Sequence, residues 1–569
     1  MNSHYPAALF LPGETFDTQS HQILGRRVAG RHFAQALASN LRAGELLTAI
    51  TISESDAWTL QQALVRHLAP SGKLRIQRGL SMKVAREAGN LHVPAPDLSQ
   101  WCQLRPWDEP RAFSITGVIH TLCSSQVLNS LEDLVLAPLY PWDALVCTSR
   151  AGRKVVERCM EERMELLRRR FNQPDLARPP GPLLPIIPLT VDARQAYAPE
   201  LSRRERRARA RHALGIPAEN FVVAFVGRLS FHSKAHPQPL YRVLAKLAKH
   251  TAGITLIECG HAFNEQIIAA YDELQHSFDG LNFIRVGGSK PAGEDEKWEA
   301  LAAADVFTSP ADNLQETFGL SLIEAMAAEL PLVVSDWDGY RDLVTPDVSG
   351  FLVPTYDVLL TLDGADKLEV LYRLGLVDYD MMIGIRSLGV IVDEEALERS
   401  LTILLRDSER RQGMAEASLQ KYNDNFSGKV VAEQYRELWG ELSKVRESDE
   451  RSRNLSRFHG SYASIFAHHA STSFEASKII IDDDGTPPEW LNSAMVRDFL
   501  QFLLGGQIPQ LICLLESKKS LSIAELHALG IKAPESRMLL AALVKFGIGR
   551  LGMGATPDSL SDPINIEDE

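Results

Sequence analysis

One uninterrupted apolar run constrains the fold of this chain more than any other feature. It reads Phe-Val-Val-Ala-Phe-Val over residues 221–226, and Gly227 and Arg228 follow it directly. Strands with a continuous apolar pattern are buried on both faces, which is typical of parallel sheets covered by helices. We therefore predict an α/β fold with a basic loop after this strand, since Lys234 lies six residues beyond Arg228.

A second motif places two carboxylates around a predicted strand-to-helix turn. Glu316-Thr-Phe-Gly-Leu-Ser-Leu-Ile-Glu324 stands between the strand-like run 306–309 and a helix-like run that ends at Pro331. The first turn of a helix presents free N–H groups and the positive end of the helix dipole, and both favour phosphate. Carboxylates accept hydrogen bonds from vicinal hydroxyls, so two of them beside a phosphate site indicate a nucleotide sugar. Arg228 is suited to bidentate phosphate contact, and Lys234 can supply a point charge.

Five pieces of the sequence occur in the order typical of one enzyme family. They are Gly227-Arg-Leu with Lys234, Leu256-Ile-Glu-Cys-Gly260, the run 302–310, the two glutamates at 316 and 324, and Val333-Val-Ser-Asp336. In this order they resemble the retaining GT-B glycosyltransferases, in particular glycosyltransferase family 4, also called glycosyl transferases group 1. The resemblance extends over residues 1–440 and is strongest from 220 to 355.

The resemblance implies a role for each candidate site residue. Arg228 and Lys234 would bind the donor diphosphate, Glu316 the donor sugar and Glu324 the nucleotide ribose. His120 would approach the donor sugar, although a capping histidine at a helix start is an alternative, and Gly13 would face the cleft unless Pro-Gly is a plain turn. The expected catalytic residues are Arg228, Lys234, Glu316 and His120, and the expected donor-binding residues are Gly13, Gly227, Phe318, Gly319, Leu320 and Glu324.

The resemblance also implies how the donor bond breaks. Basic groups and a helix dipole would neutralise the leaving diphosphate, so neither a metal ion nor another cofactor is expected. The Asp336-Trp-Asp338 and Asp378-Tyr-Asp380 pairs only imitate a metal-binding motif. The sugar would move with retention of configuration, and no general base is assigned.

The expected architecture is GT-B: two Rossmann-like doubly wound domains that face a cleft, followed by a helical, winged-helix-like module. Alternating strand and helix signals run through both domains. The range 355–393 exceeds the usual short connection and is predicted to be a helical insertion. The expected parts are an acceptor-side domain (1–195), a nucleotide-sugar-binding domain (196–446) whose helix 429–446 crosses back onto the first domain, a linker (447–488), and a helical module with an acidic tail (489–569).

Composition limits the partners. The 569 residues carry a net charge of −13, which argues against a nucleic-acid partner. The six cysteines show no metal-ligand spacing. No apolar run resembles a signal peptide or a membrane span, so we expect a cytoplasmic protein. The arginine-rich runs 168–170 and 203–212 suggest either solvated helix faces or peripheral contact with the inner face of the membrane.

The predicted function is transfer of a sugar from a nucleotide-diphosphate sugar to a glycan, lipid, protein or small-molecule acceptor. Two alternatives stay open at this point. One is a nucleotide-sugar-binding regulator that acts through a protein partner or an oligomer contact of residues 489–569. The other is a GT-B-type nucleotide-sugar epimerase, which would convert the donor without an acceptor.

Overall fold

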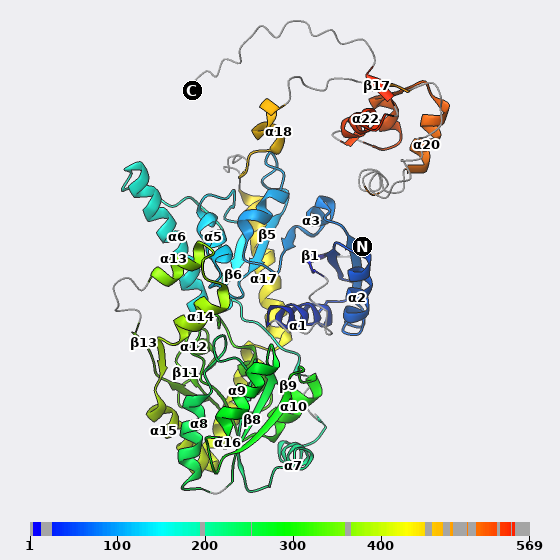
Figure 1. The fold of residues 1–569 in the computed structure, drawn as a ribbon. Helices are drawn as coiled ribbons and strands as arrows, with labels where there is room; N and C mark the ends of the chain where they lie inside the picture. The colour runs from blue at the N-terminus through cyan, green and yellow to red at the C-terminus, as the bar shows by residue number, and fades with distance from the viewer. Residues whose placement is uncertain are drawn as a thin grey trace. The chain divides into compact units, whose positions relative to one another are not determined.

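The computed structural model describes residues 4–12, 25–193, 198, 200–251, 253–358, 366–449, 458–469, 478–481, 498, 508–531, 535–547 and 549–551. The chain divides into two compact units, Met1–Phe458 and His459–Glu569. The first unit contains two large parallel sheets, each flanked by helices (Figure 1).

The first sheet has six parallel strands in the order β3-β2-β1-β4-β5-β6. Its strands are β1 (His4–Phe10), β2 (Leu46–Thr51), β3 (Lys73–Arg78), β4 (Asn90–His92), β5 (Ser114–Val118) and β6 (Ala144–Val146). Its helices are α1 (Gly25–Ser39), α2 (Glu54–Val65), α3 (Met82–Ala88), α4 (Leu98–Trp101), α5 (Ser125–Glu132) and α6 (Arg150–Phe171). Helix α6 begins after Ser149, whose side chain caps it, and ends at Asn172, which has a left-handed backbone.

The second sheet repeats this topology, with six parallel strands in the order β12-β11-β10-β7-β8-β9. Its strands are β7 (Phe221–Val226), β8 (Ile254–His261), β9 (Asn282–Gly288), β10 (Val306–Ser309), β11 (Leu332–Ser335) and β12 (Gly350–Val353). Its helices are α7 (Arg203–Ala213), α8 (Gln238–Ala248), α9 (Glu265–Gln275), α10 (Glu294–Ala303), α11 (Leu320–Ala327), α12 (Tyr340–Leu343), α15 (Glu394–Arg406) and α16 (Ser408–Asn425).

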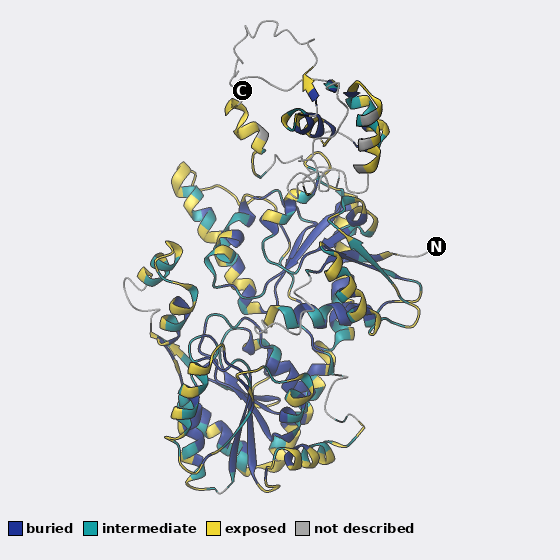
Figure 2. Cartoon of the chain, turned by 45° about the vertical axis from the view of Figure 1, so that its right-hand side comes forward, coloured by how far each residue is buried: buried dark blue, intermediate teal, exposed yellow. Residues whose placement is uncertain are grey.

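Burial explains the continuous apolar pattern of the central strands. All six residues of β7 are buried, because helices cover both faces of the sheet (Figure 2). The prediction of two doubly wound α/β domains is therefore confirmed. In both sheets the winding direction reverses beside the first strand, between β1 and β4 and between β7 and β10.

Helix α17 (Gly428–Ser448) follows the second sheet in sequence but packs in the core of the first. Its Trp439 lies edge-on to Tyr5 of β1, with ring centroids 5.7 Å apart. The indole nitrogen of Trp439 donates to the Thr116 hydroxyl of β5 at 3.1 Å. The chain thus crosses twice between the two sheets, once between Ile187 and α7 and again before α17.

The predicted insertion at 355–393 contains two helices and an additional strand pair. The helices are α13 (Lys367–Arg373) and α14 (Tyr379–Ser387). The strands β13 (Thr355–Asp357) and β14 (Val390–Val392) pair antiparallel at its base. The strands were not predicted, because three residues are too few to show a period of two.

The C-terminal unit has its own small sheet. Strands β15 (Lys478–Ile481), β16 (Ser520–Ser522) and β17 (Gly549–Leu551) are antiparallel in the order β16-β15-β17. Helices α20 (Ile508–Ser517), α21 (Ile523–Ala528) and α22 (Glu535–Lys545) share a core with the sheet. The expectation that 447–488 is only a linker needs correction, since β15 lies inside it and is the central strand. The acidic tail lies outside the described residues.

In the part of the chain that the structure describes, no helix combines the length and the apolar character needed to cross a membrane.

Candidate functional site

Predicted donor-site residues follow the two strands at the reversal point of the second sheet. Arg228 comes two residues after β7, and the loop after β10 carries Glu316. β7 and β10 are hydrogen-bonded neighbours. Gly260 of β8 lies against this loop so closely that a Cβ on it would collide with the carbonyl oxygen of Gly227. Ligands of open α/β sheets bind at the carboxyl ends of strands at such a switch point.

Lys234 and Glu316 form an ion pair in the centre of this loop cluster, and each side chain is only 14% exposed. The hydroxyl of Tyr340 also donates to the Glu316 carboxylate at 3.3 Å. Burial raises the pKa of Glu316, but Lys234 and Tyr340 outweigh it and hold the pKa below its usual range. The carboxylate is therefore ionised at neutral pH and can accept hydrogen bonds from hydroxyl groups.

Arg228 lies beside the same carboxylate. Its guanidinium donates to the side chain of Gln315 at 3.1 Å and lies over the Phe263 ring at 5.4 Å. Burial lowers the pKa of Arg228, and the charge of Glu316 opposes this shift. Together with Lys234 it provides two cations at the ends of central strands.

The turn between the two glutamates starts α11 and depends on a glycine. Gly319 is the N-cap residue with φ 112°, a conformation that other residues rarely adopt. A Cβ at this position would lie 2.7 Å from Cε1 of Tyr340. The close packing fixes the start of α11, between Phe318 and Leu320, directly after the loop that carries Glu316.

Glu324, on α11, is buried and paired with a residue that the sequence did not single out. Lys297 of α10 donates to the Glu324 carboxylate at 2.6 Å and to Glu294 at 2.9 Å. Glu294 in turn accepts from Arg31 of α1 at 3.1 Å. A chain of four alternating charges thus runs from the first domain to the carboxylate predicted to bind ribose.

Loops of the first domain meet this turn from the other side. The Ser149 hydroxyl, before α6, donates to the carbonyl oxygen of Thr317 at 2.9 Å. Cys123 and Tyr379 of the insertion lie 3.1 Å apart, between sulfur and hydroxyl. His120 lies in the same loop as Cys123, and burial with the nearby Arg26 lowers its pKa to about 4. Its ring is therefore neutral at pH 7, while Gly13 lies outside the described residues.

Five buried polar atoms of this region have no hydrogen-bond partner among the described residues. They belong to the loops after β7, β10 and β11, the end of β8 and the first turn of α11. Buried polar groups in proteins nearly always have partners, so these atoms fit a site that a polar ligand completes. They are His232 Nε2, His261 Nε2, Asp312 Oδ1, Ser321 Oγ and Asp338 Oδ1.

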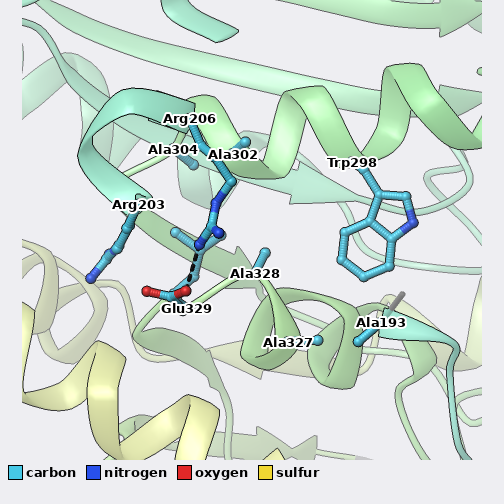
Figure 3. A pocket seen from close by; sticks show the side chains of 10 residues that line it. Ala193, Arg203, Arg206, Trp298, Ala302, Ala304, Ala327, Ala328 and Glu329 are labelled. Atoms are coloured by element: carbon cyan, nitrogen blue, oxygen red, sulfur yellow. Dashed lines mark hydrogen bonds and ion pairs between the residues drawn. The ribbon is translucent and has the colours of Figure 1, made fainter. Parts of the chain in front are cut away.

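Several arginines of the run 203–212 form ion pairs within the second domain. Arg207 and Arg211 pair with Asp305 at 3.0 and 2.7 Å. Arg206 pairs with Glu329 at 2.5 Å, in a cavity of about 200 Å³ at the C-terminal end of α11 (Figure 3). None of the predicted donor-site residues lines this cavity. Peripheral membrane contact through this run stays a prediction.

The structure brings Arg228, Lys234 and Glu316 together and places Phe318, Gly319 and Leu320 beside them. Glu324 lies on the same helix as the turn but faces Lys297. No sequence motif marks Tyr340 or Lys297 as site residues, because Glu316 and Glu324, which they contact, lie in other elements. Asp338 stands in a pair that imitates a metal-binding motif and was not predicted to belong to the site. Within the described ranges, no group of three or more His, Cys, Asp or Glu side chains is arranged to hold a metal ion.

Comparison with known proteins identifies the second sheet domain. Residues 206–369 match the family model described as Glycosyl transferases group 1. This range includes Arg228, Lys234, Glu316 and Glu324. The predicted resemblance to glycosyl transferases group 1 is thereby confirmed over these residues.

Curated relatives match over a limited region. A D-inositol 3-phosphate glycosyltransferase of Saccharomonospora viridis is 35% identical over 170 residues, which are 28% of this chain and 37% of that protein. The enzyme of the same name from Corynebacterium diphtheriae is 29% identical over 177 residues, 31% of this chain and 40% of that protein. The matches thus span well under half the length of these relatives.

Solved structures are similar to this chain at low sequence identity. Anabaena Alr3699/HepE in complex with UDP has a TM-score of 0.49 and 16% identity, covering 76% of this chain and 99% of that chain. Sucrose-phosphate synthase from Thermosynechococcus elongatus has a TM-score of 0.47 and 17% identity, covering 78% of this chain and 100% of that chain.

Proposed function

We propose that this chain, which carries a Glycosyl transferases group 1 domain, is a glycosyltransferase that uses a nucleotide-diphosphate sugar as donor. The acceptor is a glycan, lipid, protein or small molecule. The sugar is transferred with retention of configuration and without a metal ion.

One observation carries this proposal: Arg228, Lys234 and Glu316 converge at the switch point of the second sheet, beside the start of α11. Two cations and a helix N-terminus suit a diphosphate, and an ionised carboxylate suits the hydroxyl groups of a sugar. No single residue of this set is specific, but the combination fits a molecule that carries both groups.

The same groups account for catalysis. As the bond from the sugar to the diphosphate breaks, negative charge accumulates on the leaving phosphate oxygen. Arg228, Lys234 and the N–H groups at 318–320 interact more strongly with that charge than with the intact donor, which lowers the barrier. Contacts such as Ser149 to Thr317 bring the two domains together and would exclude water from the donor.

The test is release of nucleoside diphosphate from UDP-, GDP- and ADP-sugars, with lipid and glycan extracts as acceptors. We expect one donor to be consumed only when an acceptor is present, and Glu316→Gln to abolish the release. Glu265→Gln, an exposed change at the start of α9, is the matched control. The anomeric configuration of the product, read by proton NMR, tests retention.

Two results would contradict the proposal. Conversion of the donor to an isomeric sugar nucleotide without diphosphate release would identify an epimerase. Tight donor binding with no turnover across the acceptor extracts would favour a regulator.

A further inference from the structure

The turn after β11 holds Asp338 in a backbone conformation that is unusual for an aspartate. Its φ is 44°, in the left-handed region that glycine adopts most easily. Asparagine and aspartate tolerate this region better than other side chains, but not as well as glycine does. Such strain calls for an explanation from the function of the side chain.

The residues on both sides of Asp338 fix this turn against the donor loop. The indole nitrogen of Trp337 donates to the carbonyl oxygen of Asn313 at 3.0 Å. A Cβ at Gly339 would collide with the carbonyl oxygen of Thr317 and lie 2.7 Å from Cα of Phe318. The turn that contains Asp338 therefore packs directly against the turn between Glu316 and α11.

One oxygen of the Asp338 carboxyl group makes no hydrogen bond within the described part of the chain. The backbone of Gly339 lowers the pKa of the carboxyl group, against the effect of burial. Oδ1 is buried and has no hydrogen-bond partner among the described residues. If the side chain only supported the turn, a glycine at position 338 would be more stable, because it would remove the backbone strain and the buried oxygen without a hydrogen bond.

The electrostatic surroundings favour the protonated form of this carboxyl group. Burial and the adjacent carboxylate of Glu316 raise the pKa of Asp338 to about 7, and Asp342 adds to the effect. Arg341 acts in the opposite direction. The groups that face it from neighbouring elements are the Tyr340 hydroxyl of α12 and the Cys123 thiol of the first domain. Two neighbouring carboxyl groups with separated pKa values are suited to different roles.

We propose that Asp338 binds a hydroxyl group of the donor sugar and helps to select which sugar is transferred. In this arrangement Glu316 accepts hydrogen bonds from the sugar, and the protonated Asp338 donates one. The assignment deepens the proposed function and rests on it, because it takes the site around Glu316 as the sugar site. A site that pairs with a substrate hydroxyl rejects analogues that lack it.

Two substitutions separate contact with the sugar from support of the turn. Asp338→Gly relieves the backbone and removes the carboxyl group, whereas Asp338→Asn keeps the shape and a hydrogen-bond donor. Asp347→Gly is the matched control, since Asp347 also has a positive φ of 61° but is 71% exposed and pairs with Arg410. Thermal unfolding should show that all three variants fold.

The first measurement is donor binding by calorimetry, which needs no acceptor. We expect Asp338→Gly to weaken binding of the sugar nucleotide roughly tenfold, as loss of one hydrogen bond implies, and to leave the free nucleoside diphosphate unaffected. Asp347→Gly should change neither. Equal binding of the sugar nucleotide by wild type and Asp338→Gly would overturn the proposal and leave the transferase function standing.

The second measurement is the pH profile of kcat/KM for the donor. In the wild type it should fall as the pH rises through about 7, because Asp338 then loses the proton that it donates. Asp338→Asn should retain activity and show a flat profile there, since an amide donates at every pH. The wild type should have a lower kcat/KM for donors that lack one sugar hydroxyl group than for the intact donor, and this difference should be smaller in Asp338→Gly. If Asp338→Asn showed the same pH profile as the wild type, the proposal would be overturned. If no variant turned over the donor, but Asp338→Gly still bound the sugar nucleotide more weakly than the wild type, the transferase function would be contradicted instead.

Discussion

The buried charge of Glu324 on α11 is neutralised by Lys297 of another helix, α10. Lys297 and Glu324 have side chains that are 14% and 6% exposed, and Glu294 makes the second contact of the same ammonium group. Burial lowers the pKa of Lys297, but the two carboxylates outweigh it and raise the pKa above its usual value. The lysine therefore remains charged and orients Glu324.

Replacing this lysine should destabilise the protein. Lys297→Met leaves Glu324 buried without a counter-charge, and we expect a loss of about 3–5 kcal/mol in the free energy of unfolding. Lys297→Arg, which keeps the charge, should lose much less. Urea unfolding followed by circular dichroism measures both. Equal stability of Lys297→Met and wild type would show that the ion pair contributes nothing.

The sequence predicted the charged residues of the site better than their contacts. Arg228, Lys234 and Glu316 stand in motifs whose order is informative. Tyr340 reaches Glu316 from a separate helix, and no local spacing indicates this. Asp338 looked like half of a false metal motif, because its left-handed backbone is invisible in the sequence.

Among the elements, α11 connects the site to the core. Its side chains from Ser321 to Ala327 are buried, and its start is fixed by the packing of Gly319 against Tyr340. Because the helix is anchored along its whole length, its N-terminus cannot shift to accommodate a larger residue at the turn.

A methyl group at Gly319 should therefore disturb donor binding. Gly319→Ala requires a positive φ and contact with Tyr340, so we expect donor KM to rise at least about tenfold with a loss of stability. Gly413→Ala is the control, since Gly413 lies in α16 with nothing near its Cβ position. That change should raise stability by about 0.5–1 kcal/mol. Steady-state kinetics and thermal unfolding measure both effects.

In the molecule as a whole, polar contacts join the two sheet domains around the candidate site. Arg150 at the start of α6 donates to Asp342 of α12 through its side chain at 2.5 Å and through its backbone at 2.6 Å. The Arg150 side chain is 69% exposed, so the charge interaction is screened by solvent.

A double-mutant cycle tests this contact. We expect Arg150→Ala and Asp342→Ala to raise donor KM, with a coupling energy of about 0.5–1 kcal/mol that shrinks at high salt. Arg153→Ala with Glu157→Ala, an ion pair within α6, is the matched control and should leave KM unchanged. If the effects of Arg150→Ala and Asp342→Ala on KM simply added, the contact between these two residues would not contribute to donor binding.

Acid should loosen the first sheet domain. Burial lowers the pKa values of His32 and His92 to about 3 and that of His120 to about 4, from 6.5. The unfolded chain binds these protons first, so stability is complete above pH 6.5 and is lost as the pH falls toward these values. Below pH 6.5, each histidine lowers the free energy of unfolding by up to about 1.4 kcal/mol per pH unit.

Unfolding midpoints measured between pH 7 and 4.5 test this expectation. His92 lies among Phe33, Tyr435 and Trp439, so His92→Phe should fit the cluster and flatten the pH dependence. The exposed His276→Gln should leave it unchanged. An identical slope in His92→Phe and wild type would contradict the assignment.

By itself, the sequence determined the α/β class, the alternation of strands and helices in both domains, and the charged residues that meet at the candidate site. These features are local: apolar periodicity, capping residues and turn glycines depend on neighbours a few positions away. Tertiary structure alone decided the pairing of Lys297 with Glu324, the strain at Asp338, the contact of Ser149 with Thr317 and the strand β15 in the expected linker. Such features depend on which segments meet in space, and short-range patterns in a single sequence carry no record of that.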